Sequence, residues 1–89
     1  MPARFIVRLT PSVQRDLETL PRSVQEKVLG ELKRLENNPF GPPPRIKKLK
    51  GKGAGQWRLE VWPYRVRYDV VEQEVALYRV RHRKDIYRG

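Results

Sequence analysis

The last third of the chain alternates between apolar and polar residues, and this alternation restricts the fold more than any other feature of the sequence. It begins at Gln56 and is interrupted at Pro63 and at Glu72-Gln73. A period of two is typical of β-strands, because successive side chains point to opposite faces of a sheet. We therefore expect a three-stranded antiparallel meander, with one strand that begins at Gln56 and stops before the turn at Pro63 and the others at Tyr64–Val71 and Glu74–His82.

The first part of the chain predicts one more strand and then two helices. Residues Ala3 to Leu9 alternate and are expected to form a strand with one buried face. Thr10-Pro11 is a favourable helix start, because Thr caps the first turn and Pro suits the first helical position. Apolar residues at helical spacing then predict a short helix as far as Leu20 and a second one over Pro21 to Asn37. Helices joined this closely are expected to form an antiparallel hairpin.

Two connecting segments separate the helices from the meander. Asn38 to Pro44 reads NPFGPPP, which predicts a stiff connector because proline fixes the backbone and removes a donor. Arg45 to Gly55 contains three glycines and is expected to form a mobile basic loop. The order strand, helix, helix, three strands predicts a small α+β fold, with the helical hairpin on one face of the sheet. A chain of 89 residues fits one domain.

The composition limits the partners and cofactors. Lys and Arg number 20 against 10 Asp and Glu, and a net charge of +10 attracts nucleic acid, anionic lipid or an acidic protein. The lack of cysteine excludes disulfides and thiolate metal sites, and a single histidine argues against zinc, so we expect no metal and no other cofactor. No apolar run spans a membrane and no signal peptide is evident, so we expect a cytoplasmic protein.

Two segments of the meander share one pattern: Tyr64–Tyr68 reads YRVRY and Tyr78–His82 reads YRVRH. In each segment, alternation is expected to place the aromatic and valine side chains on one face and two arginines on the other. An arginine-rich face, together with the basic stretch at 45–52, predicts a surface that binds a polyanion. The alternative for any one of these arginines is a solvated side chain that covers the sheet.

Whether the two pairs of arginines share a face depends on the strand register. All four lie together if Val71 pairs with Val75 across a three-residue turn, and they separate if Val71 pairs with Glu74. We favour the first register because it gives the helices a continuous apolar face. A bulge near the strand ends would change the direction of Arg81 or His82 in either register.

The segments LKGKGAGQWRLEVWPYRVRYDVV and HRKDIYR, in this order and spacing, resemble the RelE/ParE superfamily of bacterial and archaeal toxins from type II toxin–antitoxin systems. The resemblance covers nearly the whole chain and implies one RelE-like toxin domain over residues 1–89. RelE-type members are metal-independent ribonucleases that cleave mRNA in the ribosomal A site, where the 2′-OH attacks the adjacent phosphate and leaves a 2′,3′-cyclic phosphate. ParE-type members inhibit DNA gyrase. An antitoxin holds both types inactive.

The ending HRKDIYR is more similar to the RelE type than to the ParE type. The resemblance therefore implies a ribosome-dependent endoribonuclease that inhibits translation, with a cognate antitoxin, the ribosome and mRNA as partners. Two alternatives remain: a ParE-like gyrase inhibitor, and a basic nucleic-acid-binding module without catalysis.

The resemblance also assigns candidate catalytic residues. Arg65 corresponds to a functional arginine of RelE toxins, and a guanidinium fork suits a clamp on the scissile phosphate. Arg81 is expected to stabilise the developing charge, with Arg83 as its competitor for that role. Tyr87 matches the late tyrosine of the family, which would stack on a base or transfer a proton; the alternative is an aromatic side chain packed on the sheet edge.

The remaining candidates are basic or titratable. Lys50 and Lys52 match paired lysines of the family, and both would lower the pKa of the attacking hydroxyl or contact rRNA, with Lys52 as the catalytic candidate. His82 suits an acid or base, or packs at the strand end. We interpret Glu60, beside Arg58, as an ion-pair partner rather than as a base. The residues expected to contact RNA or the ribosome are Lys47, Lys48, Lys50, Arg58, Arg67 and Arg83.

Overall fold

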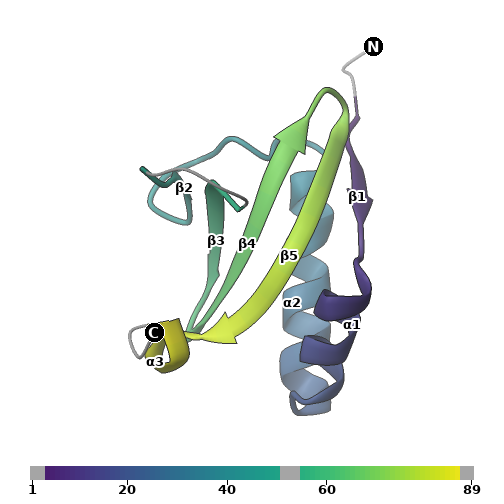
Figure 1. The fold of residues 1–89 in the computed structure, drawn as a ribbon, viewed down its shortest axis with the longest axis vertical. Helices are drawn as coiled ribbons and strands as arrows, with labels where there is room; N and C mark the ends of the chain where they lie inside the picture. Colours follow the sequence, from purple (N-terminus) through teal and green to yellow (C-terminus); the bar gives the residue numbers. More distant parts are fainter. Residues whose placement is uncertain (1–3, 51–54, 87–89) are drawn as a thin grey trace.

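The computed structural model describes residues 4–50 and 55–86, without the side chains of residues 85 and 86, and its central feature is a mixed five-stranded sheet (Figure 1). The strand order is β1-β5-β4-β3-β2. Strand β1 pairs with β5 in parallel, and all other neighbours are antiparallel. The strands are β1 (Ile6–Arg8), β2 (Ile46–Lys48), β3 (Trp57–Val61), β4 (Tyr64–Val71) and β5 (Glu74–His82), and the helices are α1 (Pro11–Glu18), α2 (Arg22–Leu35) and α3 (Arg83–Ile86). The expected α+β fold with a C-terminal meander is confirmed.

The helices start where the sequence predicts. Thr10 caps α1, since its Oγ1 accepts a hydrogen bond of 3.3 Å from the N–H of Val13, and Pro11 is the first helical residue. Both helices end earlier than predicted, α1 at Glu18 and α2 at Leu35. The first strand is also shorter, and Ala3 lies outside the described residues. None of these helices is long and apolar enough to cross a membrane.

The apolar stripes of the helices and the inner face of the sheet share one core, which is composed of Val13, Leu17, Val28, Leu32, Leu35, Ile46, Leu59, Val61, Val66, Tyr68, Val75, Leu77 and Val80. Tyr68 is its largest fully buried side chain, and its hydroxyl donates a hydrogen bond of 2.7 Å to the carbonyl of Pro39. Burial raises the pKa of that hydroxyl. The bond joins the proline-rich connector to the middle of the sheet.

The prediction of a basic loop over Arg45 to Gly55 is wrong at Ile46–Lys48, because these residues form strand β2. Ile46 is buried and pairs with Leu59, and Lys47 and Lys48 continue the ladder along β3. A strand of three residues with one apolar side chain is too short to show an alternating pattern. Its stability comes from the partner strand and the core beneath it, which the local sequence does not reveal.

The favoured register between β4 and β5 is also wrong at the turn. Val71 pairs with Glu74 across Glu72 and Gln73, so the turn has two residues rather than three. Nevertheless, the four arginines share a face, because a β-bulge at Tyr78 shifts the ladder by one residue. Beyond the bulge, Arg67 pairs with Arg79 and Arg65 pairs with Arg81.

The bulge moves Tyr78 away from the face where it was expected, beside Val80 and His82. Leu77 takes the core position opposite Tyr68, and Tyr78 has no partner in the ladder. The hydroxyl of Tyr78 instead hydrogen-bonds the carboxylate of Asp69, which lies on the opposite face of the sheet. Burial and this carboxylate raise the pKa of Tyr78. The apolar face is therefore continuous, but Leu77 completes it in place of Tyr78.

Candidate RNA-binding and catalytic site

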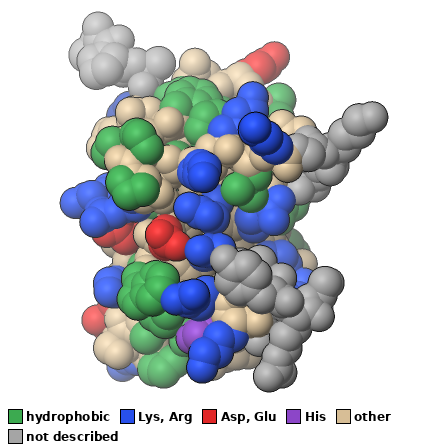
Figure 2. Space-filling view, turned by 90° about the vertical axis from the view of Figure 1, so that its left-hand side faces the viewer, with side chains coloured by type: hydrophobic (Ala, Val, Ile, Leu, Met, Phe, Trp, Pro, Cys, Tyr) green, Lys and Arg blue, Asp and Glu red, His purple; other side chains and the backbone are tan. Residues whose placement is uncertain are grey.

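One face of the sheet packs on the helices, and we call the other the open face. The register places these cations on it: Arg8, Lys47, Arg58, Arg65, Arg67, Arg79 and Arg81. Its acidic residues are Glu60, Asp69 and Glu74. Figure 2 shows Lys and Arg side chains gathered over the middle of the side of the molecule that it presents, with few acidic side chains among them. Such a concentration of positive charge attracts a polyanion.

Arg65 and Arg81, the first two candidates for catalysis, are direct cross-strand partners on the open face. Side chains in such pairs have Cβ atoms only about 5 Å apart, so both guanidinium groups can reach one phosphate. Arg65 lies in the central strand β4, and its side chain is 15% exposed. Its Nε donates a hydrogen bond of 3.1 Å to Glu60 Oε1. The prediction that Glu60 is an ion-pair partner is confirmed, with Arg65 rather than Arg58 as the cation.

Arg79 has a different environment, because β5 loses its neighbour before this position. The pairing with β1 ends at Ala76, and the carboxylate of Asp16 in α1 occupies the edge of β5 beyond it. Asp16 accepts hydrogen bonds of 2.9 Å from the N–H of Val80 and 2.9 and 3.1 Å from the guanidinium of Arg79. Burial acts to raise the pKa of Asp16, but these bonds outweigh it and hold the pKa below 3.8. The positive charge of Arg79 is therefore balanced by the Asp16 carboxylate.

An open cavity of about 350 Å³ lies along this edge and brings Arg81 and His82 together with Tyr64 and Asp16. The ring of His82 packs edge-on against Tyr64, with centroids 5.3 Å apart. The Nδ1 of His82 accepts a hydrogen bond of 3.1 Å from the N–H of Lys84. Because an accepting ring nitrogen carries no proton, the neutral ring has its proton on Nε2. His82 thus presents a donor at the end of β5, next to Arg81.

The other predicted contact residues are distributed unevenly. Lys47 and Arg58 are cross-strand partners on the open face, whereas Lys48 projects to the opposite face, with Nζ 5.9 Å from the centre of the Trp57 ring. Lys50 is exposed. Lys52 and Tyr87 lie outside the described residues.

Arg67 and Asp69 fix the chain where the described residues resume at Gly55. Arg67 Nε donates a hydrogen bond of 2.6 Å to the carbonyl of Gly55, and Asp69 accepts from the N–H groups of Gly55 and Gln56 at 2.9 and 2.7 Å. Burial opposes the ionisation of Asp69, but these bonds, the Tyr78 hydroxyl and the charge of Arg67 lower its pKa. Gly55 has a φ of 76°, which favours glycine. These contacts hold Gly55 and Gln56 against the open face.

Arg83, the competitor of Arg81, lies in α3 with its guanidinium 4.5 Å from the centre of the Trp62 ring. Sequence reasoning overlooked Trp62 and Asp16 as parts of this region. The signal for Trp62 was its position before the turn at Pro63, whereas Asp16 carries no signal in the sequence. The described ranges contain no group of three or more His, Asp or Glu side chains arranged to hold a metal ion.

Comparisons with known proteins agree with this fold. Residues 7–87 match the family described as the ParE toxin of the type II toxin–antitoxin system parDE. The toxin–antitoxin complex RelBE2 of Mycobacterium tuberculosis contains a similar chain, with a TM-score of 0.78 and 26% identity over 92% of this chain and 94% of that one. For the RelE–RelB complex of Pyrococcus horikoshii the TM-score is 0.73, with 25% identity over 90% and 96%. A comparison with curated sequences gives no significant match.

The small α+β domain and the comparisons together identify this protein as a toxin of the type II toxin–antitoxin class. The chain belongs to the ParE toxin family and, with its RelE-like neighbours, to the RelE/ParE superfamily.

Proposed function

We propose that the chain is the toxin of a type II toxin–antitoxin system and a ribosome-dependent, metal-independent endoribonuclease that cleaves mRNA in the A site. The observation that carries this proposal is the direct pairing of Arg65 with Arg81 on the open face, next to His82. Two guanidinium groups at one end of a basic surface suit a phosphodiester whose charge increases during the reaction. Action on ribosomes implies a cytoplasmic protein.

The residues suggest how the reaction would proceed. The 2′-oxygen forms a bond to phosphorus, the bond to the 5′-oxygen breaks, and a 2′,3′-cyclic phosphate remains. Arg65 and Arg81 would donate hydrogen bonds to the non-bridging oxygens, whose negative charge is greatest in the transition state. His82 would give a proton from Nε2 to the leaving 5′-oxygen, entering as imidazolium and releasing the N–H of Lys84. The proton of the 2′-hydroxyl would pass to water.

The test is cleavage of translated mRNA. With purified ribosomes, an mRNA and the toxin, 5′ ends should appear within codons in the A site and should require translation. Arg65→Ala and Arg81→Ala are each expected to lower the cleavage rate about 100- to 1000-fold, the loss seen when one group that stabilises an oxyanion is removed. Arg22→Ala removes the same charge from an exposed position on α2 and should cleave like the parent. Intact translated mRNA would overturn the proposal.

The match to the ParE family favours a second candidate, the inhibition of DNA gyrase. This candidate predicts loss of supercoiling activity when toxin is added to purified gyrase, with no cleavage of mRNA. A module that only binds nucleic acid would show neither effect and would bind RNA in a salt-dependent manner.

The similar chains from M. tuberculosis and P. horikoshii are held in complexes with antitoxins. For this chain we propose a cognate antitoxin with an acidic segment that covers the open face, because it would offset much of the net charge of +10. Arg81→Glu should therefore weaken antitoxin binding. An antitoxin bound only to the helical side would contradict this arrangement.

A further inference from the structure

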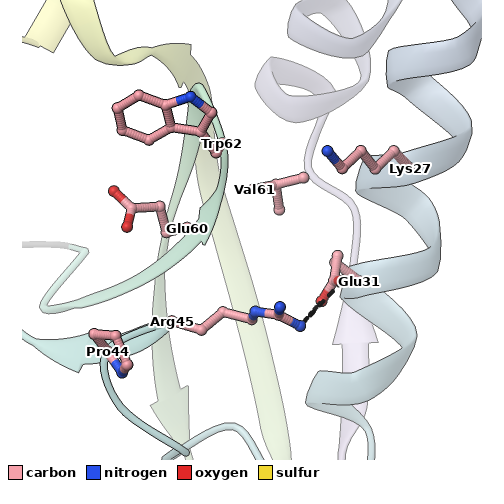
Figure 3. Close-up of a pocket in the computed structure, with 7 residues that line it drawn as sticks. All are labelled: Lys27, Glu31, Pro44, Arg45, Glu60, Val61 and Trp62. Carbon is pink, nitrogen blue, oxygen red and sulfur yellow. Dashed lines mark hydrogen bonds and ion pairs between the residues drawn. The ribbon is translucent and has the colours of Figure 1, made fainter.

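Trp62 is exposed to an unusual degree for a large aromatic side chain. It follows β3 at the start of the turn to β4, and 57% of its surface is accessible. An indole left in water forgoes the stabilisation that burial would give it, so its position calls for a ligand or a partner. Figure 3 shows the ring directed to the same side of β3 as the carboxylate of Glu60, whereas Val61 points toward α2. Trp62 thus extends the open face beyond Glu60.

The guanidinium of Arg83 lies 4.5 Å from the centre of the indole ring. The two residues come from different strand ends, but their neighbours are close, because the N–H of Arg83 donates a hydrogen bond of 2.9 Å to the carbonyl of Pro63. A cation beside the ring restricts its rotation, and the exposed fraction of Trp62 leaves surface for a further contact. The pair is therefore a preformed flat surface with a positive charge attached.

The position of this pair relates it to the arginine site. Tyr64 pairs with His82 across β4 and β5. Trp62, two residues before Tyr64, and Arg83, directly after His82, therefore lie at the same end of the sheet as Arg65 and Arg81. The indole also forms one wall of an open pocket of about 330 Å³ at the edge of β3. Its other walls include Lys27 and the ion pair of Arg45 with Glu31 (Figure 3).

We propose that Trp62 and Arg83 form a stacking platform for a nucleobase of single-stranded RNA next to the scissile phosphate. Every base has a flat aromatic face, and stacking on an exposed tryptophan beside cations is a general way to hold a single strand. The proposal rests on the proposed function, since it names the part of the substrate that this end of the site holds. Trp62 is then a residue that contacts substrate, and Arg83 is a positioning residue rather than a clamp on the scissile phosphate.

The test uses tryptophan fluorescence. The chain has two tryptophans, so Trp57→Phe leaves Trp62 as the sole reporter while keeping an aromatic ring against Phe40. The probe is a short oligoadenylate with 2′-O-methyl riboses, which cannot be cleaved, and its matched control is the abasic oligomer of equal length. The oligoadenylate should quench the emission of Trp62, and the abasic oligomer should bind through its phosphates without quenching. Equal quenching by both would overturn the platform.

The matched protein variants are Trp62→Ala and Trp62→Phe. Trp62→Ala should weaken binding of the oligoadenylate about 5- to 150-fold, the range for loss of one stacked base, and should leave the affinity for the abasic oligomer unchanged. Trp62→Phe should retain most of the affinity. Arg83→Ala should weaken both probes, because it removes a charge as well as an orienting contact. Unchanged oligoadenylate affinity in Trp62→Ala would contradict the proposal, as would a defect confined to antitoxin or gyrase binding.

The outcomes separate the platform from the proposed function, because the binding assay needs neither ribosomes nor cleavage. Base-dependent quenching without any cleavage of translated mRNA would support the platform and overturn the nuclease. Cleavage that proceeds while Trp62→Ala changes neither the affinity for a labelled oligoadenylate, measured by anisotropy, nor the cleavage rate would overturn the platform and leave the nuclease standing.

Discussion

The two YRVR segments of this chain have the same sequence pattern and different structural roles. The β4 segment is central in the sheet, with a neighbour on each side, and Arg65 is mostly buried beside Glu60. The β5 segment lies where β1 has ended, and Arg79 is 46% exposed and bound to Asp16 in α1. One pattern therefore yields a partly buried arginine held by Glu60 in one strand and an edge arginine paired with a helix carboxylate in the other.

Two tyrosines, Tyr68 in the β4 segment and Tyr78 in the β5 segment, show the same contrast between the strands. Tyr68 closes the β4 segment and is fully buried, with its hydroxyl on Pro39. Tyr78 opens the β5 segment and leaves the ladder through the bulge toward Asp69. A strand with two neighbours has no freedom to bulge without disturbing both, whereas the end of β5 has only β4 to follow. Position in the sheet, more than the local sequence, decides what each residue does.

The largest expected effect comes from the buried tyrosine. Tyr68→Ala removes a core aromatic side chain and should lower the free energy of unfolding by about 3–5 kcal/mol. Tyr68→Phe keeps the ring and leaves the carbonyl of Pro39 without its donor, which should cost about 1–2 kcal/mol. Tyr78→Ala should cost less than either, because Asp69 keeps two backbone donors. Urea denaturation measures all three, and equal losses at positions 68 and 78 would remove the distinction between the segments.

The meander, the helix start at Thr10-Pro11 and the shared arginine face could be predicted from the sequence, because each depends on local period or on capping chemistry. The register could not be predicted. The preference for a continuous apolar face favours a three-residue connection, whereas the molecule reaches the same arginine pairing with a two-residue turn and a bulge at Tyr78. The shorter turn and the bulge each shift the pairing by one residue, in opposite directions. An alternating sequence pattern cannot distinguish this arrangement from a regular ladder after a three-residue turn.

The parts of the site that sequence reasoning missed lie where a short strand stops. Strand β1 ends beside Ala76, which leaves the edge of β5 to Asp16. Strand β2 begins at Ile46 beside Leu59, and the part of β3 that precedes this pairing in space, at Val61, borders the pocket at Trp62. Both roles depend on the lengths of three-residue strands, which tertiary pairing sets and local sequence does not. Arg65 and Arg81 were named from the resemblance to RelE toxins, and the structure shows that they are direct cross-strand partners.

A smaller change in the free energy of unfolding is expected at the edge of β5, where one substitution removes the ion pair that distinguishes Arg79 from Arg65. Asp16→Asn keeps an acceptor for the N–H of Val80 and removes the charge that neutralises Arg79. The unfolding free energy should fall by roughly 1 kcal/mol, because the ion pair is partly solvated. RNA affinity at low salt should rise, since Arg79 becomes available beside Arg81. Anisotropy titrations over a range of salt measure this, and weaker binding by Asp16→Asn would show that the pair with Arg79 orders the site instead.

The smallest effect is the acid dependence of stability, and it compares the carboxylates that serve the two segments. The pKa values of Asp16 and Asp69 are both lowered in the folded chain, so their contribution is present above pH 3.8 and is lost as the pH falls through the folded values. Asp16→Asn and Asp69→Asn should each flatten the fall in unfolding free energy below pH 3.8, and Glu18→Gln, an exposed change on α1, should leave the slope unchanged. Asp69 accepts two backbone N–H groups that persist in any ionic strength, whereas Asp16 depends on the charge of Arg79. Added salt should therefore reduce the acid sensitivity due to Asp16 more than that due to Asp69. Urea midpoints measured across pH and salt test this order. The opposite order would show that the site of Asp16 at the β5 edge is more rigid than the site of Asp69.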